Sequence, residues 1–285
     1  MDVERVCVIG LGLMGGSLAL ALRGQATLVG LDAAAAARRQ ALQSGVFDRV
    51  TDDPAVGLRD AGAVILATPV RSILRLLDQL PSLRPDGCLV LDVGSTKGAI
   101  TRAMAALPQS FEAIGGHPMC GKETAGFAAA TPDLYRDHTF ILCRNARTTP
   151  RAEAFALDLL RHVGARPLFL PAGAHDTLVA ATSHLPYVVA AVLMHSVAAV
   201  DDDRLWPVSA AGFRDTARLA GSDPRMMLDI LLTNRAAVLD QLDHYQAHLA
   251  ELKSLLLNND EAALSQWLTA AQRHHTAYRE IKRKA

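Results

Sequence analysis

Short apolar runs rich in β-branched residues alternate with helix-forming stretches from Arg5 to Leu170. This alternation predicts a doubly wound sheet of the α/β class. Proline lacks the N–H group that a central strand needs, so the run that begins at Pro167 predicts an edge strand. The predicted strands are Arg5–Ile9, Ala26–Leu31, Ala63–Ala67, Cys88–Asp92, Phe111–Ile114, Thr139–Cys143 and Pro167–Leu170.

From Ala174 onward the pattern becomes almost entirely helical. A long apolar segment runs to Val200, and Asp223-Pro224 has the form of a helix start, a capping residue followed by proline. Apolar residues then recur at helical spacing up to Leu257, which predicts one continuous stripe. A last helix is expected from Glu261 onward.

Composition agrees with two domains. The 285 residues suffice for two separate cores, and the change of pattern predicts a doubly wound domain over residues 1–172 and an all-α domain over 173–285. Lys plus Arg and Asp plus Glu both number 29, so no net field favours nucleic acid or an anionic membrane. The chain start lacks signal-peptide features, and no apolar stretch is clean enough to span a bilayer. We therefore expect a cytoplasmic protein.

A glycine pattern, Gly10-Leu11-Gly12-Leu13-Met14-Gly15, follows the first predicted strand and opens a helix. Its glycines permit a tight turn, backbone approach to a pyrophosphate and close helix packing, as in the Rossmann-type dinucleotide fingerprint. Asp32, at the end of the second strand, can accept hydrogen bonds from a ribose hydroxyl and would repel a 2′-phosphate. This favours NAD over NADP, although Arg38 and Arg39 keep NADP open as an alternative.

Two polar loops follow later strands at the same predicted edge of the sheet, where the nicotinamide half of a dinucleotide would lie. One contains Thr68 and Pro69. In the other, Ser95 can bind the cofactor, the substrate or His117, or cap a helix, while Lys97 is either a proton-transfer residue or a surface lysine. The expected cofactor contacts are Gly10, Gly12, Leu13, Met14, Gly15, Asp32, Thr68 and Pro69.

The segment from Gly115 to Glu123 places His117 in a glycine-framed turn directly after a predicted strand. A histidine at this edge of the sheet can hold or take a proton near neutral pH. We therefore interpret His117 as a candidate general base, the alternative being a structural turn histidine.

Six segments together resemble prephenate and arogenate dehydrogenases of tyrosine biosynthesis, in the same order and over nearly the whole chain. They are GLGLMGGS, ATPV, DVGSTKG, GGHPMCGKETAGF, AHDTLVAATSHLPY and GFRDTARLAGSDP. The resemblance implies NAD-dependent oxidative decarboxylation of prephenate to 4-hydroxyphenylpyruvate, with arogenate, or both substrates as in cyclohexadienyl dehydrogenases, as the alternative. It also implies a homodimer formed through the helical domain, and too little chain remains after the last helix for the regulatory ACT domain of some relatives.

The resemblance also implies roles for single residues. His117 and Ser95 are the expected catalytic residues, and Arg214 is the expected clamp for the substrate side-chain carboxylate. Glu123 and Asp176 fall at positions where acidic residues can hold that arginine before substrate arrives.

Three further residues are candidates for substrate contact. His184 and Tyr187 share one face of a helix that Pro186 should kink, with ordinary packing as the alternative for both. The family usually has histidine where this chain has Tyr187, so a positive charge is missing there, and Lys122 is expected either to supply it or to be solvated.

Other functions fit less well. The histidines near residues 244–275 lack cysteine or paired carboxylate partners, so no metal site is expected. β-Hydroxyacid dehydrogenases share the glycine pattern, but their interdomain lysine is not recognisable here. A noncatalytic NAD-binding sensor would have no need for a base beside the nicotinamide.

Overall fold

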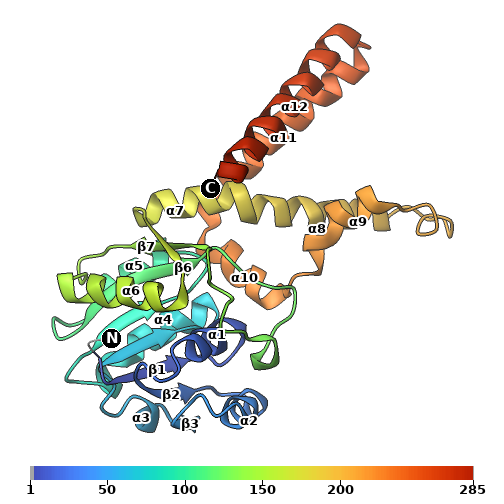
Figure 1. Ribbon diagram of the computed structural model, residues 1–285. Coiled ribbons are helices and arrows are strands. Elements are labelled where there is room, and N and C mark those ends of the chain that lie inside the picture. The colour runs from blue at the N-terminus through green and yellow to red at the C-terminus, as the bar shows by residue number, and fades with distance from the viewer. Residues whose placement is uncertain (1–2, 285) are drawn as a thin grey trace. The chain divides into compact units, whose positions relative to one another are not determined.

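The computed structural model describes residues 3–284, in which the chain forms two compact units that divide between Ala237 and Val238. The predicted domain boundary at residues 172 and 173 lies within the first unit. This unit contains a sheet covered by helices on both faces (Figure 1). Its strands are β1 (Arg5–Ile9), β2 (Thr27–Leu31), β3 (Arg49–Thr51), β4 (Ala63–Leu66), β5 (Leu89–Asp92), β6 (Glu112–Pro118), β7 (Thr139–Cys143) and β8 (Arg166–Phe169).

Helices account for most of the remaining chain. Those that precede β8 are α1 (Leu13–Ala21), α2 (Ala35–Gln43), α3 (Pro54–Gly57), α4 (Val70–Leu83), α5 (Gly98–Ala105), the 3-10 turn η1 (Phe127–Ala129) and α6 (Pro150–Val163). Those that follow β8 are α7 (Ala172–Val179), the π-helical turn η2 (Ala180–His184), α8 (Leu185–Ala198), α9 (Ala211–Ala217), the 3-10 turn η3 (Arg218–Gly221), α10 (Pro224–Thr233), α11 (Arg235–Leu257) and α12 (Glu261–Lys284).

The eight described strands follow the order β3-β2-β1-β4-β5-β6-β7-β8. All neighbouring pairs are parallel except β6 and β7, so the sheet is a doubly wound parallel sheet with one antiparallel step. Side chains alternate across each strand. Val6 and Val8 therefore join a core with α1 and α6, whereas Cys7 and Ile9 join a second core with α4 and α5.

The predicted fold class is confirmed, with two local differences. The short strand β3 was not predicted, because its three residues carry too little pattern. The run from Phe111 was expected to end at Ile114, but β6 continues to Pro118, so His117 lies in a strand paired with Ile141 and not in a turn. A side chain at Gly116 would come within 2.5 Å of the Asp92 carbonyl oxygen, so glycine permits this extension of the strand.

The helical segment of the first unit begins with a continuous run of α7, η2 and α8. The expected disturbance near Pro186 takes the form of the π-turn η2, which accommodates the carbonyl that proline cannot satisfy. Asp223 caps α10 by accepting from the N–H groups of Arg225 and Met226, as predicted. The expected continuous stripe is instead interrupted at Asn234, where α10 ends.

The second unit is a pair of helices, the main part of α11 and α12, joined by a short turn. Asn259 adopts a left-handed conformation in that turn, with φ 51°. This matches the break expected from the sequence. Trp267 on α12 donates to Glu251 on α11 at 3.2 Å, which ties the two helices together.

Candidate active site

The glycine loop after β1 has the geometry that its spacing predicts. Gly10 adopts φ 98°, and a side chain there would come within 2.6 Å of the Ala67 carbonyl oxygen. A side chain at Gly15 would approach the Gly10 carbonyl oxygen to 2.0 Å, so α1 packs directly against the loop. A side chain at Gly12 would meet no atom within 4 Å, which leaves open space beside the start of α1.

A cleft of about 460 Å³ opens beside this loop at the carboxyl ends of β1, β2 and β4. Gly10, Gly12, Asp32, Thr68 and Pro69 line it, five of the predicted cofactor contacts. Thr68 Oγ1 is one of two buried side-chain N or O atoms without a partner among residues 3–284. A backbone cradle and an unpartnered hydroxyl are features that a bound dinucleotide would complete, so these residues fit one.

The other three predicted cofactor contacts lie in the first turn of α1, and one of them is Gly15, which packs against Gly10. Leu13 and Met14 are partly buried against the core, and the Met14 carbonyl oxygen accepts from the Tyr135 hydroxyl at 2.7 Å. None of the three lines the cleft, so their contact with a cofactor stays a prediction.

Asp32 is fixed at the edge of the cleft by the backbone. Its carboxylate accepts from the Leu11 N–H and from the Ala34 N–H, each at 2.7 Å. Arg38 donates to the carbonyl oxygens of Asp32 and Ala33 and pairs with Asp52 at 2.7 Å. The Arg38 guanidinium, which could have bound a 2′-phosphate, is therefore already paired with groups of the protein.

A buried ion pair between Lys97 and Asp92 lies near the carboxyl ends of β5 and β6. Lys97 and Asp92 are both 0% exposed, and the lysine Nζ donates to the Asp92 carboxylate. The same carboxylate accepts from the N–H groups of Gly94 and Gly116, at 2.7 and 3.0 Å. Lys97 is thus no surface lysine, and the pair joins the end of β5 to the backbone just before His117.

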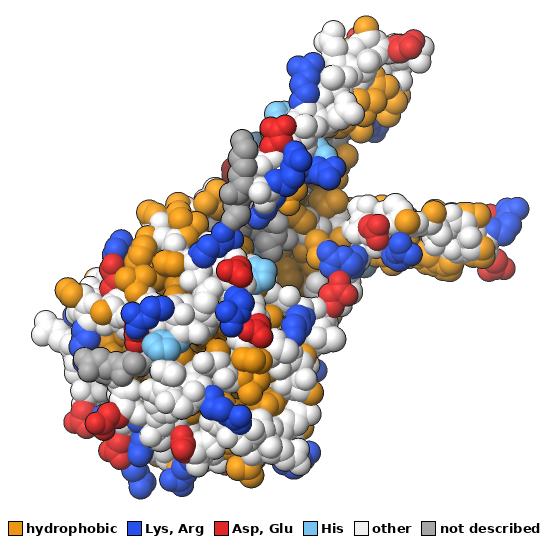
Figure 2. Space-filling model, in the orientation of Figure 1, with side chains coloured by type: hydrophobic (Ala, Val, Ile, Leu, Met, Phe, Trp, Pro, Cys, Tyr) orange, Lys and Arg blue, Asp and Glu red, His pale blue; other side chains and the backbone are white. Residues whose placement is uncertain are grey.

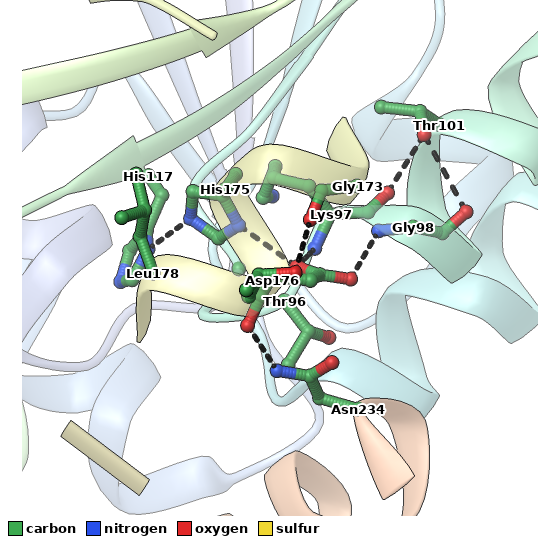
Figure 3. Close-up of polar contacts among 12 residues, drawn as sticks. Thr96, Lys97, Gly98, Thr101, His117, Gly173, His175, Asp176, Leu178 and Asn234 are labelled. Carbon is green, nitrogen blue, oxygen red and sulfur yellow. Dashed lines mark hydrogen bonds and ion pairs between the residues drawn. The ribbon is translucent and has the colours of Figure 1, made fainter. Parts of the chain in front are cut away.

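His117 belongs to a row of three side chains, shown in Figure 3. Its Nδ1 lies 2.8 Å from Nε2 of His175, and Nδ1 of His175 lies 2.8 Å from the Asp176 carboxylate. His117 projects from β6, whereas His175 and Asp176 come from the first turns of α7. Within residues 3–284 no hydrogen bond reaches Nε2 of His117, and the residue remains partly accessible.

The electrostatic surroundings keep His117 neutral. Burial, and then the positive charge of Lys97, lower the pKa of His117 well below its usual value, and His175 and His184 act in the same direction. A histidine with a lowered pKa is unprotonated at neutral pH and can accept a proton.

Asp176 differs from its expected role, which is a correction. Its carboxylate accepts from the N–H groups of Lys97 and Gly98, each at 2.7 Å, as well as from His175, and it makes no contact with Arg214 among the described residues. Burial raises the pKa of Asp176, but these three donors outweigh burial and lower it. Asp176 therefore holds the start of α5, a role that was one of the alternatives for Ser95.

The sequence leaves His184 with two alternatives, substrate contact and ordinary packing. It is 1% exposed, and its Nδ1 lies 3.2 Å from the side-chain amide of Asn234, which donates to the Asp176 carbonyl oxygen at 2.7 Å. Burial lowers the pKa of His184 to about 4. The burial of His184 favours its packing alternative over a direct substrate contact, whereas the partly exposed Tyr187 stays a predicted contact.

Glu123, which follows the strand β6 that carries His117, pairs with Arg218, an arginine that was not predicted to be its partner. Glu123 accepts from Arg218 at 2.7 Å, whereas Arg214 contacts its neighbour Asp215 at 3.4 Å and is 77% exposed. The expected pair of Glu123 with Arg214 is therefore wrong in its partner. Lys122 donates to the Ala129 carbonyl oxygen and to Thr131 and stays a predicted charge.

A second hollow, of about 620 Å³, lies elsewhere on the first unit. It is lined by Val3, Leu89 and residues of α6, at the amino ends of β1 and β5. An open parallel sheet binds its ligands at the opposite, carboxyl edge. The larger hollow is therefore not the candidate site.

The glycine cleft and His117 lie at the same edge of the sheet, where the parallel strands end, and this arrangement indicates the class of protein. A dinucleotide-dependent dehydrogenase needs a cradle for its cofactor and a base at the carboxyl ends of one sheet, and this chain provides both. The chain is an enzyme of that class.

Comparison with known proteins identifies the family. Residues 18–168 match the nucleotide-binding domain of prephenate dehydrogenase and residues 171–270 its dimerization domain. The chain therefore belongs to the prephenate dehydrogenase family. A prephenate dehydrogenase of Bacillus subtilis is 33% identical over 94% of this chain and 74% of its own length. A cyclohexadienyl dehydrogenase of Zymomonas mobilis is 32% identical over 96% of both chains.

A solved structure agrees over almost the whole chain. Prephenate dehydrogenase from Aquifex aeolicus, in complex with hydroxyphenyl propionate and NAD+, matches with a TM-score of 0.91 and 27% identity. The match covers 98% of this chain and 99% of that one.

Proposed function

We propose that this protein catalyses the NAD-dependent oxidative decarboxylation of prephenate to 4-hydroxyphenylpyruvate. The observation that carries the proposal is a neutral His117 whose Nε2 is left for a substrate at the cofactor edge of the sheet. The names of the relatives and the complex of the Aquifex enzyme with NAD+ support it. Arogenate is the second candidate, because the Zymomonas relative is named for the broader cyclohexadienyl class.

The reaction asks little of the protein beyond positioning and one base. Bound NAD supplies the hydride acceptor. His117 Nε2 accepts the C4 hydroxyl proton as the C4–H bond breaks and hydride leaves C4 for that acceptor, which makes C4 a carbonyl carbon. The bond from the ring to its carboxylate then breaks, carbon dioxide leaves, and the released electron pair completes the aromatic ring with the oxygen as a phenolate. His117 can then return the proton to the phenolic oxygen. Ser95, which lies in the loop between Asp92 and Lys97, is proposed to bind the same hydroxyl.

NAD is the proposed cofactor. Gly10, Gly12 and Thr68 would hold it, and Asp32 would accept from its adenosine ribose. The engagement of Arg38 by Asp52 and by backbone carbonyls supports NAD over NADP, because this guanidinium is not available to a 2′-phosphate.

The decisive experiment measures kcat/KM for prephenate and for arogenate, each with NAD and with NADP. We expect the highest value for prephenate with NAD. A higher value with NADP would contradict the role of Asp32, and a higher value with arogenate would reverse the substrate assignment. A protein that binds NAD and turns over neither substrate would be the noncatalytic sensor.

We propose that Arg218 supplies the clamp for a substrate carboxylate and that Glu123 holds it until the substrate arrives. Glu123 follows β6, the strand that carries His117, by only five residues, and this proximity in the chain supports the proposal. Losing a hydrogen bond to a charged group costs about 1.5–3 kcal/mol, so Arg218→Ala is expected to raise KM for prephenate roughly 10–100-fold and to change kcat less. Arg214→Ala is the matched comparison, and a larger increase in KM from it would return the role to Arg214.

We also propose a homodimer formed through the helices that follow β8. Leu178 and Val192 are 52% and 56% exposed, and Figure 2 shows hydrophobic side chains along α8 and α9. The match to a dimerization domain supports this surface as the interface. Val192→Glu is expected to raise the dimer dissociation constant at least about tenfold in sedimentation experiments, from the lost apolar burial. Leu42→Glu, at a 64% exposed position on α2, should leave it unchanged.

We infer a cytoplasmic location as well. The helix over residues 172–198 is long and apolar enough to cross a membrane by length and composition. However, His175, Asp176 and His184 on this helix are buried and hydrogen-bonded within the first unit. These contacts support a helix that is part of the active site and not a membrane span, in agreement with the inferred location.

A further inference from the structure

His175 is a fully buried histidine with a polar partner at each ring nitrogen. Its exposed fraction is 0%, and its ring meets that of His117 edge-on, with 5.0 Å between the centroids. Both nitrogens lie 2.8 Å from their partners, His117 on one side and Asp176 on the other. A buried ring nitrogen without a partner would be costly, so both hydrogen bonds satisfy the ring, and together they also determine its tautomer.

The state of the carboxylate decides which nitrogens carry protons. Asp176 accepts from two backbone N–H groups at the start of α5, where the helix dipole also favours a negative charge. An ionised carboxylate only accepts, so the proton of His175 resides on Nδ1 and its Nε2 is an acceptor. His117 must then donate from Nδ1, which leaves the lone pair of its Nε2 for the substrate.

Resting on the proposed function, we propose that His175 and Asp176 are positioning residues for His117. They hold it in the tautomer that can act as a base. When the substrate O–H bond breaks, its proton binds Nε2, and the imidazolium that forms keeps its Nδ1 hydrogen bond to the acceptor nitrogen of His175. The Nδ1 proton stays on His117 throughout, and its hydrogen bond to His175 shortens as the positive charge appears.

Other charged groups face His117 as well. Lys97 and His184 lie near enough to affect its charge, and Asp92 binds the backbone of the preceding Gly116. A shift in pH profile alone would not separate the effect of His175 from theirs. The test therefore uses hydrogen-bond geometry and coupling to His117.

The experiment compares three substitutions of His175. His175→Phe removes both contacts, His175→Asn retains an amide only near the Nδ1 position, and His175→Gln places an amide oxygen near the Nε2 position that His117 needs. We expect kcat for prephenate to fall about 100-fold in the first two variants, within the range for a lost acid–base function. The Gln variant should recover most of kcat, with KM and the NAD dissociation constant changing less than threefold in all three.

Coupling to His117 is measured by a double-mutant cycle. If His175 acts only through His117, His175→Phe should change kcat less than twofold in a His117→Asn background. Thermal unfolding midpoints identify a variant that fails to fold. In that event the Asn and Gln variants decide.

Two results would overturn the proposal. One is a folded His175→Asn enzyme with kcat within threefold of the wild type. The other is a loss from His175→Phe that persists undiminished in the His117→Asn background. Failure of the proposed function would look different, because the wild-type protein would then turn over neither prephenate nor arogenate.

Discussion

Replacing His117 with asparagine is expected to lower kcat for prephenate by about 10²–10⁴-fold, the usual contribution of a general base. Asparagine retains a polar side chain of similar reach but cannot accept a proton at neutral pH. The dissociation constant for NAD, measured by fluorescence titration, should change little, because the cofactor cleft is lined by other residues. The loss should therefore appear in turnover and not in cofactor binding.

The matched control is His162→Asn on α6. His162 is also partly buried, and its Nδ1 contacts the Asp158 carbonyl oxygen at 2.7 Å, outside the candidate site. It should leave kcat within twofold of the wild type. Near-normal turnover in His117→Asn would remove the general-base assignment, and an equal loss in both variants would point to damaged folding.

The pH profile of the wild-type enzyme gives an independent check on His117. A base must be unprotonated to act, so kcat/KM should fall as the pH drops through the pKa of His117. Burial and the Lys97 charge lower that pKa well below its usual value. Activity should therefore persist below pH 6.5, where an ordinary histidine would already be mostly protonated.

Features encoded over short stretches of sequence could be predicted. The fingerprint from Gly10 to Gly15 specifies a turn whose geometry depends on its own glycines, and Asp32 follows from the strand that ends there. The antiparallel direction of β7 could not be predicted in this way. The residue pattern of a strand does not show whether it runs parallel or antiparallel to its neighbour. That direction depends on how distant segments of the chain pack together.

The contacts behind His117 were missed because the residues that make them lie far apart in the chain. Lys97 and Asp176 are 79 positions apart, and nothing near either residue shows that one will bind the other's backbone. His175 stands directly before Asp176, and this adjacent pair at a helix start was the available signal. The sequence predicted Arg214 as the partner of Glu123, whereas the partner is Arg218, four residues later. The two arginines lie about one helical turn apart, and a linear pattern does not distinguish them.

Replacing Lys97 with methionine is expected to lower the free energy of unfolding by about 3–5 kcal/mol, the cost of leaving a buried charge without its partner. The Asp92 side chain would lose its cationic partner in an enclosed site, since both side chains are 0% exposed. Urea denaturation measures the loss. Arg136→Met is the control, because its pair with Asp133 is more than half exposed and should contribute about 0–1 kcal/mol.

The same substitution should also move the pH profile. Removing the Lys97 cation removes a group that disfavours protonation of His117, so the pKa of His117 rises. The acid limb of kcat/KM must then shift to higher pH. An unmoved limb in a folded Lys97→Met enzyme would show that His117 does not set the profile.

The double variant Asp92→Asn/Lys97→Met separates these two effects. Neutralising both partners removes the unpaired charge, while the asparagine oxygen can still accept from the N–H of Gly116. Part of the lost stability should return. The acid limb should remain displaced, because the cation that lowers the pKa of His117 is still absent. If stability and pH profile recovered together, the acid limb would depend on the balance of the Asp92 and Lys97 charges and not on the Lys97 cation alone.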